Sequence, residues 1–327
     1  MVAAESAVCG PRAEFFHGEL PALDENVLAA LVYGTARAPQ DDARFVRVGL
    51  ATTDGKPAVE LWRTVRAVTT GESGPIRFAT GGDFLFGCLE LEESREGGML
   101  AAAESAYRIL LEFQARQPQR HLLRVWNHLY AINEGEGDCE RYRQFCLGRA
   151  RGLAKLKAEQ LPAGTAVGRR ERPGLLQVCW LAGRCAGRPI GNPRQVQAYL
   201  YPRQYGPAAP CFSRAMLLPD DALMGSGTAS IVGHESKHDG DLNAQIDETL
   251  INLRELFRAG DGIAARGRRE VDDDASIAAK VYLRRGGSPL EVAARIRAGL
   301  PGTVDLLLLE ADICRRELLV EIECTRN

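Results

Sequence analysis

The segment Asp312-Ile-Cys-Arg-Arg-Glu-Leu-Leu-Val-Glu-Ile-Glu323 carries a clear strand pattern near the end of the chain. An extended strand here has one face with Leu318, Val320 and Ile322 and another with Leu319, Glu321 and Glu323. A carboxyl group set between apolar neighbours can lose solvation, which raises its pKa toward the range useful for proton transfer near neutral pH. Glu321 is therefore a candidate acid/base. The alternative is that Glu321 and Glu323 line the wet face of a half-exposed strand.

Size and composition are those of a globular chain. Its 327 residues, 45% of them hydrophobic, allow one large or two ordinary domains. With 41 basic and 43 acidic residues the net charge is -2, which does not favour nucleic acid or an anionic membrane as a partner. No apolar run approaches the roughly 20 residues of a membrane span, and the first residues lack a signal-peptide pattern. We therefore expect a cytoplasmic protein.

The nine cysteines are scattered and include no C-x-x-C pair, which is typical of reduced thiols rather than a disulfide framework or a zinc site. His234 and His238 have the i, i+4 spacing that a helix could offer to a metal. The glycines around them indicate a loop instead, so no metal and no cofactor is expected.

The two halves of the chain show a similar order of elements. In the first half we predict strands at 44–51, 58–68, 76–80, 84–92 and 121–131, and helices at 99–117 and 138–157. In the second half we predict strands at 175–182, 195–201, 212–218, 229–232, 277–283, 304–309 and 318–323. Helices are predicted at 241–259 and from Ser288, which begins a capping box. Residues 1–40 are expected to form an irregular extension with one short helix near 26–32.

This order predicts an α+β fold of two units packed side by side, each a mixed sheet with helices on one face, and a ligand cleft between them. The Pro/Gly/Arg-rich segment 161–174 joins the units. The expected division is 1–40 as the extension, 41–165 as the N-terminal half and 166–327 as the C-terminal half, which carries most of the candidate catalytic residues.

The segment Tyr199-Leu-Tyr-Pro-Arg-Gln-Tyr-Gly206 suits a cyclic carboxylate. Strand alternation would place Tyr199, Tyr201, Arg203 and Tyr205 on one side. Arginine matches a carboxylate with two parallel hydrogen bonds, and tyrosine offers an apolar face with a polar tip. Arg214 could supply a second guanidinium. The alternative is a strand end stacked at the protein surface.

Three other stretches have both a structural and a functional interpretation. The glycine-rich turn 225–230 precedes a strand, so a steric role is favoured over a phosphate site. The stretch 126–137 is an aromatic strand end followed by polar residues and glycines, where function often lies, although a tight turn alone would explain it. Cys314 is either a small core residue or a thiol made reactive by Arg315 and Arg316.

Four segments together resemble the chorismatase family: RVWNHLYAINEGEGDCERYRQFCLGRAR (124–151), PIGNPRQVQAYLYPRQYGPAAPCFSR (189–214), GSGTASIVGHESKHDGD (225–241) and ICRRELLVEIE (313–323). The first hundred residues match only in general character. The last strand also resembles the closing strand of the YjgF-like group. The family's fold of two YjgF-like halves agrees with the repeated order of elements.

The resemblance implies that the substrate is chorismate, a cyclohexadiene with a ring carboxylate and an enolpyruvyl ether that carries a second carboxylate. It places Glu321 at the catalytic glutamate, which protonates the terminal methylene so that pyruvate can leave. The residues it assigns to substrate binding are two anchors, Arg203 and Arg214, and a frame around the ring formed by Tyr199, Tyr205, Asn127 and Tyr130.

Gly227 and Cys314 stand where the family members that form 3-hydroxybenzoate carry glycine and cysteine. A glycine leaves room for the ring to shift, and a thiolate could accept the proton removed during internal displacement or aromatisation. This favours 3-hydroxybenzoate, with 4-hydroxybenzoate as a further product. The alternatives are a hydrolytic chorismatase that releases a dihydroxycyclohexadiene carboxylate, and a YjgF-like binding protein without turnover. A monomer or a small homo-oligomer is expected.

Overall fold

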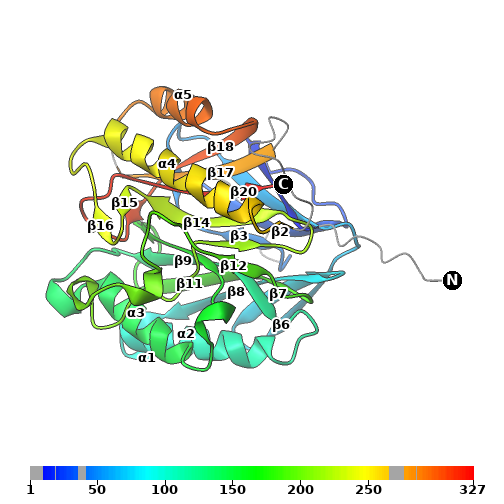
Figure 1. Cartoon of the computed structure of the whole chain (residues 1–327). Helices are drawn as coiled ribbons and strands as arrows, with labels where there is room; N and C mark the ends of the chain where they lie inside the picture. Colours follow the sequence, from blue (N-terminus) through cyan, green and yellow to red (C-terminus); the bar gives the residue numbers. More distant parts are fainter. Residues whose placement is uncertain (1–9, 19, 36–41, 265–275, 285) are drawn as a thin grey trace.

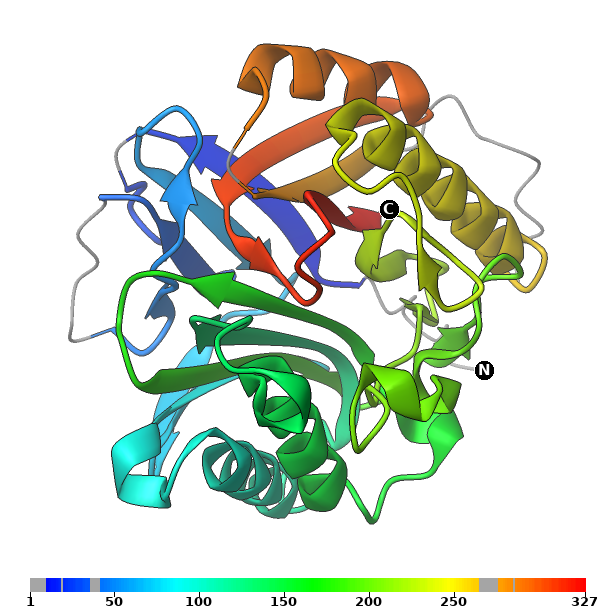
Figure 2. The same ribbon diagram turned by 90° about the vertical axis from the view of Figure 1, so that its left-hand side faces the viewer.

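The computed structural model describes residues 10–18, 20–35, 42–264, 276–284 and 286–327. Two seven-stranded sheets and one four-stranded sheet form the centre of the protein. Figures 1 and 2 show the helices on two opposite sides of the molecule, with the sheets between them. The α+β class predicted from the sequence is confirmed.

The first seven-stranded sheet has the strand order β19-β10-β9-β11-β8-β7-β6. Helices α1 (Glu93–Glu96), α2 (Met99–Gln114) and α3 (Arg141–Gly152) cover one side of it. Ala102, Ala106 and Leu110 recur at helical spacing in α2 and belong to one apolar cluster with Leu85 and Val125 of the sheet. The strands are β6 (Thr69–Ser73), β7 (Ile76–Gly81), β8 (Phe84–Glu92), β9 (His121–Tyr130), β10 (Ala163–Arg169), β11 (Leu175–Gly183) and β19 (Asp312–Ile313).

The second seven-stranded sheet has the order β12-β13-β14-β20-β17-β18-β4, so β20 lies at its centre. Helices α4 (Leu242–Asp261) and α5 (Pro289–Gly299) cover its outer side, where Ile246 and Leu253 of α4 share an apolar cluster with Val320 and Ile322. The strands are β4 (Ala51–Thr52), β12 (Arg188–Ile190), β13 (Ala215–Leu217), β14 (Leu223–Ala229), β17 (Ser276–Leu283), β18 (Thr303–Glu310) and β20 (Val320–Arg326).

The N-terminal region forms a four-stranded sheet in the order β1-β5-β2-β3. Its strands are β1 (Arg12–His17), β2 (Val27–Tyr33), β3 (Phe45–Arg47) and β5 (Ala58–Arg63). The predicted helix near 26–32 is therefore wrong, and within the described residues 10–35 the expected irregular extension is two strands. All seven residues of β2 are buried, and a continuous apolar run is the pattern of a strand covered on both faces. Residues 1–9, 19 and 36–40 lie outside the described residues.

Each large sheet includes one short strand from the opposite end of the chain. β19 pairs with β10, and β4 pairs with β18. The predicted boundary at residue 165 lies inside β10, and both β10 and β11 belong to the first sheet, so the sheets do not divide the chain at that residue. One apolar cluster, which includes Trp62, Trp126 and Leu309, joins all three sheets.

Several local predictions differ from the structure. Residues 195–201 form no strand; the segment contains the 3-10 helix η3 (Ala198–Leu200). It is followed by Pro202, which cannot donate to a sheet ladder, and by a second 3-10 helix, η4 (Arg203–Tyr205). Most of the predicted turn 225–230 is strand β14 itself. The predicted helix 138–157 is η1 (Gly137–Cys139), α3 and a loop that leads to η2 (Ala158–Gln160). A short hairpin, β15 (Ile231–Val232) and β16 (Glu235–Ser236), follows β14.

Within the described residues, no helix has the length and apolar character needed to cross a membrane. The eight described cysteines are free thiols. The same part of the chain holds no group of three or more His, Cys, Asp or Glu side chains arranged for a metal ion. His234 and His238 contact different partners, Tyr205 and Glu248.

Candidate active site

A cavity of about 420 Å³ opens where the two large sheets meet. Strand β10 of the first sheet contributes Thr165, while β14 and β20 of the second contribute Gly227 and Glu321. Helix α3, the segment 201–214 and the segment 314–317 form the remaining walls. Its size is in the range of small-molecule sites, and its place between two units agrees with the predicted cleft.

Glu321 lies on β20 with 4% of its surface exposed, and it lines the cavity. Val320 and Ile322 pack on the helix-covered side of the sheet, so Glu321 and Glu323 share the inner side. Both are buried, which rules out the alternative of a wet strand face. Burial raises the pKa of Glu321 to about 8, nearby Glu323 adds to this rise, and Arg124 and Arg214 oppose it. Glu321 is therefore a protonated acid at neutral pH.

Gly227 leaves the space that the Glu321 carboxyl group occupies. A Cβ atom at this position would lie 2.7 Å from Cδ of Glu321 and closer still to Oε1. The pairing of β14 with β20 is irregular between Gly225 and Thr228, so a β-bulge brings this glycine up to the acid. The steric role favoured for the glycine-rich stretch thus agrees with the observed geometry.

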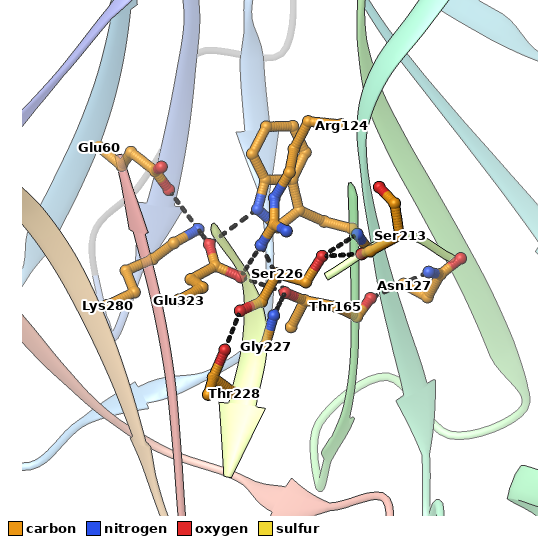
Figure 3. A network of polar contacts seen from close by, with 12 residues as sticks. Glu60, Arg124, Asn127, Thr165, Ser213, Ser226, Gly227, Thr228, Lys280 and Glu323 are labelled. Atoms are coloured by element: carbon orange, nitrogen blue, oxygen red, sulfur yellow. Dashed lines mark hydrogen bonds and ion pairs between the residues drawn. The ribbon is translucent and has the colours of Figure 1, made fainter. Parts of the chain in front are cut away.

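Glu323, in contrast to Glu321, is surrounded by positive charges and hydrogen-bond donors. Burial alone would raise the pKa of Glu323, but Lys280 and Arg124 outweigh it and lower the pKa to about 2. Figure 3 shows this network, which is drawn from all three sheets. The contacts of the Glu323 carboxylate are Lys280 Nζ at 2.8 Å, Arg124 Nη2 at 2.6 Å, Trp126 Nε1 at 2.8 Å and Thr165 Oγ1 at 2.5 Å. Lys280 also pairs with Glu60 at 2.7 Å.

Two buried guanidinium groups line the cavity with unused hydrogen-bond donors. Arg214 donates from Nη2 to Val196 O and to the Tyr201 hydroxyl, both at 2.7 Å, while its Nε has no partner among the described residues. Arg149 of α3 is 2% exposed, and its Nε and Nη2 likewise have no described partner. Neither guanidinium pairs with a carboxylate in the described part of the chain, and a buried positive charge without an opposite charge is costly, so both groups favour an anionic ligand in the cavity.

Aromatic rings and a third arginine form another wall of the cavity. The guanidinium of Arg315 lies 3.9 Å from the ring centroid of Tyr205 and 5.2 Å from that of Tyr201. The Tyr205 hydroxyl contacts His234 Nδ1 at 3.2 Å. Arg315 also donates to His234 O at 2.9 Å, which fixes the wall to the loop after β15. The result is a rigid, partly apolar surface beside the acid.

Cys314 lines the cavity, as the sequence predicts for a residue close to Glu321. Burial raises the pKa of its thiol well above the ordinary value of 9, and Glu321 adds to the rise, while Arg315 opposes it only in part. Cys314 is therefore a neutral thiol at neutral pH. The expected thiolate, activated by neighbouring arginines, does not agree with this environment.

Four of the predicted binding residues do not line the cavity. Arg203 lies at the surface with 65% of its side chain exposed and pairs with Asp138. Tyr199 packs against the α2–α3 cluster because the segment is helical and not extended. Asn127 is fully buried, where it bonds Tyr107 and Thr165 O, and Tyr130 is the last residue of β9. The structure brings together Glu321, Cys314, Gly227, Arg214 and Tyr205.

Sequence reasoning missed Arg149 and Thr165 as cavity residues; it placed Tyr201 correctly on the ligand side of its segment, and it named Arg315 only as a neighbour of Cys314. A signal for Arg149 was present, because Tyr142, Phe145 and Arg149 recur at helical spacing and lie on one side of α3. Tyr201 follows η3 and Tyr205 ends η4, and their ring centroids lie 5.5 Å apart. Nothing in the sequence marks Thr165, because its place depends on pairing between β10 and distant segments.

Known chorismatases are similar in sequence to this chain over most of its length. Residues 60–182 match the family described as "Chorismatase FkbO/Hyg5-like, N-terminal". A 3-hydroxybenzoate synthase from Streptomyces hygroscopicus is 34% identical over 93% of this chain and 92% of its own. A chorismatase from the same species is 34% identical over 92% of this chain and 89% of its own.

The fold also matches that of a solved relative. A crystal structure of a chorismatase covers 97% of this chain and 98% of its own, with a TM-score of 0.86 and 31% identity. The YjgF gene product of E. coli aligns with 42% of this chain and 96% of its own, with a TM-score of 0.28 and 15% identity. On the sequence similarity to whole chorismatases and the matching fold, the chain belongs to the chorismatase family.

Proposed function

We propose that this protein converts chorismate into 3-hydroxybenzoate and pyruvate. The observation that carries the proposal is Glu321, a buried acid that stays protonated at neutral pH and lines a cavity with two under-bonded arginines. A relative that matches nearly the whole chain bears the name 3-hydroxybenzoate synthase. The two products together contain every atom of the substrate, so the reaction consumes no water.

The anchors for the two carboxylates of chorismate are Arg149 and Arg214. Each has a buried donor without a described partner, and each can form charge-assisted hydrogen bonds to a carboxylate. This differs from the anchors expected from the sequence, because Arg203 is engaged with Asp138 outside the cavity. The ring of the substrate would lie against Tyr205 and Phe212, which line the space between the anchors and the acid.

The reaction begins with proton transfer from the Glu321 carboxyl group to the terminal methylene of the enolpyruvyl ether. The ether carbon becomes an oxocarbenium, and the Glu321 carboxylate left behind stabilises this positive charge at close range. The oxygen of the ring hydroxyl then bonds to the adjacent ring carbon as the bond from that carbon to the ether oxygen breaks and pyruvate leaves, and the hydroxyl proton returns to Glu321. The resulting epoxide opens at its other C–O bond, and the proton on the ring carbon that keeps the oxygen moves to that oxygen, which makes the product aromatic. A pKa of about 8 suits this acid, because it is protonated at neutral pH and still able to give up the proton.

Gly227 and Cys314 are proposed to control which product forms. Gly227 leaves room beside the acid, so the substrate can approach Glu321 closely. Because Cys314 is held as a neutral thiol, we assign it a steric and hydrogen-bonding role next to the ring and no role as a resting thiolate. A small, weakly polar group there would keep water from the oxocarbenium and so favour internal displacement over hydrolysis.

The test is to incubate the purified protein with chorismate, to measure pyruvate with a coupled dehydrogenase, and to identify the other product by chromatography and mass spectrometry. We expect the amount of pyruvate to equal the sum of the two hydroxybenzoates, with 3-hydroxybenzoate as the main product and 4-hydroxybenzoate as a minor one. The Glu321→Gln variant should release no pyruvate, whereas Glu72→Gln, which changes an exposed glutamate on β6, should match the parent protein.

Three other results of this experiment would contradict the proposal. A dihydroxycyclohexadiene carboxylate in place of the aromatic acid would show the hydrolytic reaction. Thermal stabilisation by chorismate without pyruvate would show a binding protein. Substantial turnover by Glu321→Gln would remove Glu321 from its role as the acid.

A further inference from the structure

The inner side of β20 carries two carboxyl groups with opposite surroundings. Glu321 receives no hydrogen bond from the described residues, whereas the Glu323 carboxylate has four donors around it. The two residues are separated by one position on the strand and point the same way, about 7 Å apart. Only Glu321 lines the cavity.

We propose that Glu323 is a positioning residue for the reaction: as a permanent buried anion it keeps the proton on Glu321 and holds β10 and the Gly227 bulge against that acid. The proposal rests on the proposed role of Glu321 as proton donor. It assigns a function to the network in Figure 3, in which Thr165 and Gly227 line the cavity while Glu323, Lys280, Arg124 and Glu60 do not.

The geometry of the network leaves Glu323 little freedom. Its side chain is 5% exposed, and its partners come from β9, which contributes both Arg124 and Trp126, from β10 and from β17. Glu60 of β5 occupies the other side of Lys280 at 2.7 Å. Two carboxylates and two cations thus form a closed set, and removal of one member leaves an uncompensated charge in a dry region.

The same network reaches the cavity through Thr165. Its hydroxyl donates to Glu323 Oε2 at 2.5 Å and accepts from Gly227 N at 3.1 Å. One residue earlier, Gly164 N donates to Ser226 Oγ at 2.9 Å. The bulge that makes room for the Glu321 carboxyl group is therefore fixed by a hydroxyl that Glu323 orients.

Other charged groups near the acid do not cancel the effect of this anion. Arg124 is already paired with Glu323, and Arg214 bonds Val196 O and Tyr201. Burial keeps the other titratable neighbours neutral near pH 7, because it raises the pKa of tyrosine and cysteine and lowers that of histidine. These neutral groups are Tyr33, Tyr282 and Cys314, whose pKa values are raised, and His128, whose pKa is lowered.

The expected effect follows from the charge that is lost. A unit charge about 7 Å away, at an effective dielectric constant of about 20, shifts a neighbouring ionisation by roughly 1 to 2 pH units. In the parent protein, kcat/KM should fall as pH rises through about 8, where Glu321 loses its proton. In Glu323→Gln this fall should begin about 1 to 2 pH units lower, because the anion that opposes ionisation is gone.

Two double variants test the same point even if the single variant Glu323→Gln does not fold. Glu323→Gln/Lys280→Met and Glu60→Gln/Lys280→Met each remove Lys280 and one of its two carboxylate partners. They disturb the same buried region, but only the first removes the anion beside Glu321. We expect the alkaline limb of kcat/KM to move to lower pH in the first and to stay or move upward in the second.

The pH profiles of these variants decide the proposal, and they separate it from the proposed function. If the two double variants show the same limb, or if a folded Glu323→Gln variant keeps the limb of the parent, Glu323 does not act on Glu321. If Glu321→Gln retains turnover, Glu321 is not the proton donor, and the fall of kcat/KM at high pH reflects the ionisation of another group. An inactive Glu321→Gln together with an unmoved limb would overturn only the role of Glu323.

Discussion

Replacement of Glu321 by glutamine should remove activity and at the same time stabilise the protein in a pH-dependent way. Burial raises the pKa of Glu321 from 4.5 to about 8 in the folded state. Below pH 4.5 the carboxyl group is protonated whether the chain is folded or unfolded. As pH rises from 4.5 to 8, only the unfolded chain releases the proton, so the free energy of unfolding falls. Above pH 8 both states are ionised and the penalty is constant.

The size of the effect follows from the same values. At pH 7 the parent protein loses about 3 kcal/mol relative to a neutral side chain, and above pH 8 about 5 kcal/mol. For a chain of 327 residues, 3 kcal/mol corresponds to about 4 °C in Tm. The Gln variant escapes this loss because its amide does not ionise. Any cost of burying the amide is the same at every pH, so it cancels from the pH dependence.

Thermal unfolding measured by tryptophan fluorescence at pH 5, 6, 7 and 8 checks this prediction. Tm of Glu321→Gln minus Tm of the parent should increase steadily over that range, by about 5 °C in total. Glu72→Gln should run parallel to the parent at every pH, because that side chain is exposed. A Tm difference between Glu321→Gln and the parent that does not change with pH would refute the raised pKa, and with it the reasoning that makes Glu321 an acid at neutral pH.

Three further substitutions test the cavity. Gly227→Ala should lower kcat about 100-fold, because the new methyl group overlaps the Glu321 carboxyl group and displaces it; an unchanged kcat would contradict the close approach. Arg149→Met should raise KM for chorismate about 10- to 100-fold through loss of charge-assisted hydrogen bonds, and an unaltered KM would remove it as an anchor. Cys314→Ala should shift the product toward the hydrolytic diene-diol by opening space for water. Chromatography measures the ratio of 3-hydroxybenzoate to the diene-diol carboxylate. If Cys314→Ala leaves this ratio unchanged, Cys314 does not control the product.

The elements that the sequence predicts well are those with a repeating local pattern. Helices α2 and α4 and strand β20 follow from apolar spacing that recurs over two or more turns or strand periods. The prediction failed at β2, where the run VLAALVY has no alternation because the strand is buried on both faces. It also failed at 195–201, where local alternation suggested a strand but the segment holds the 3-10 helix η3 and is followed directly by Pro202.

The candidate site divides in the same way. The sequence by itself determined that Glu321 and Glu323 share one side of a core strand, because strand alternation is a local property. Only the tertiary structure decided that one of them is an acid and the other an anion, since Lys280, Arg124 and Thr165 bond Glu323 from other strands and none of them donates a hydrogen bond to Glu321. A pKa depends on burial and on charges brought from distant parts of the chain, and those distances exist only after the sheets have packed together.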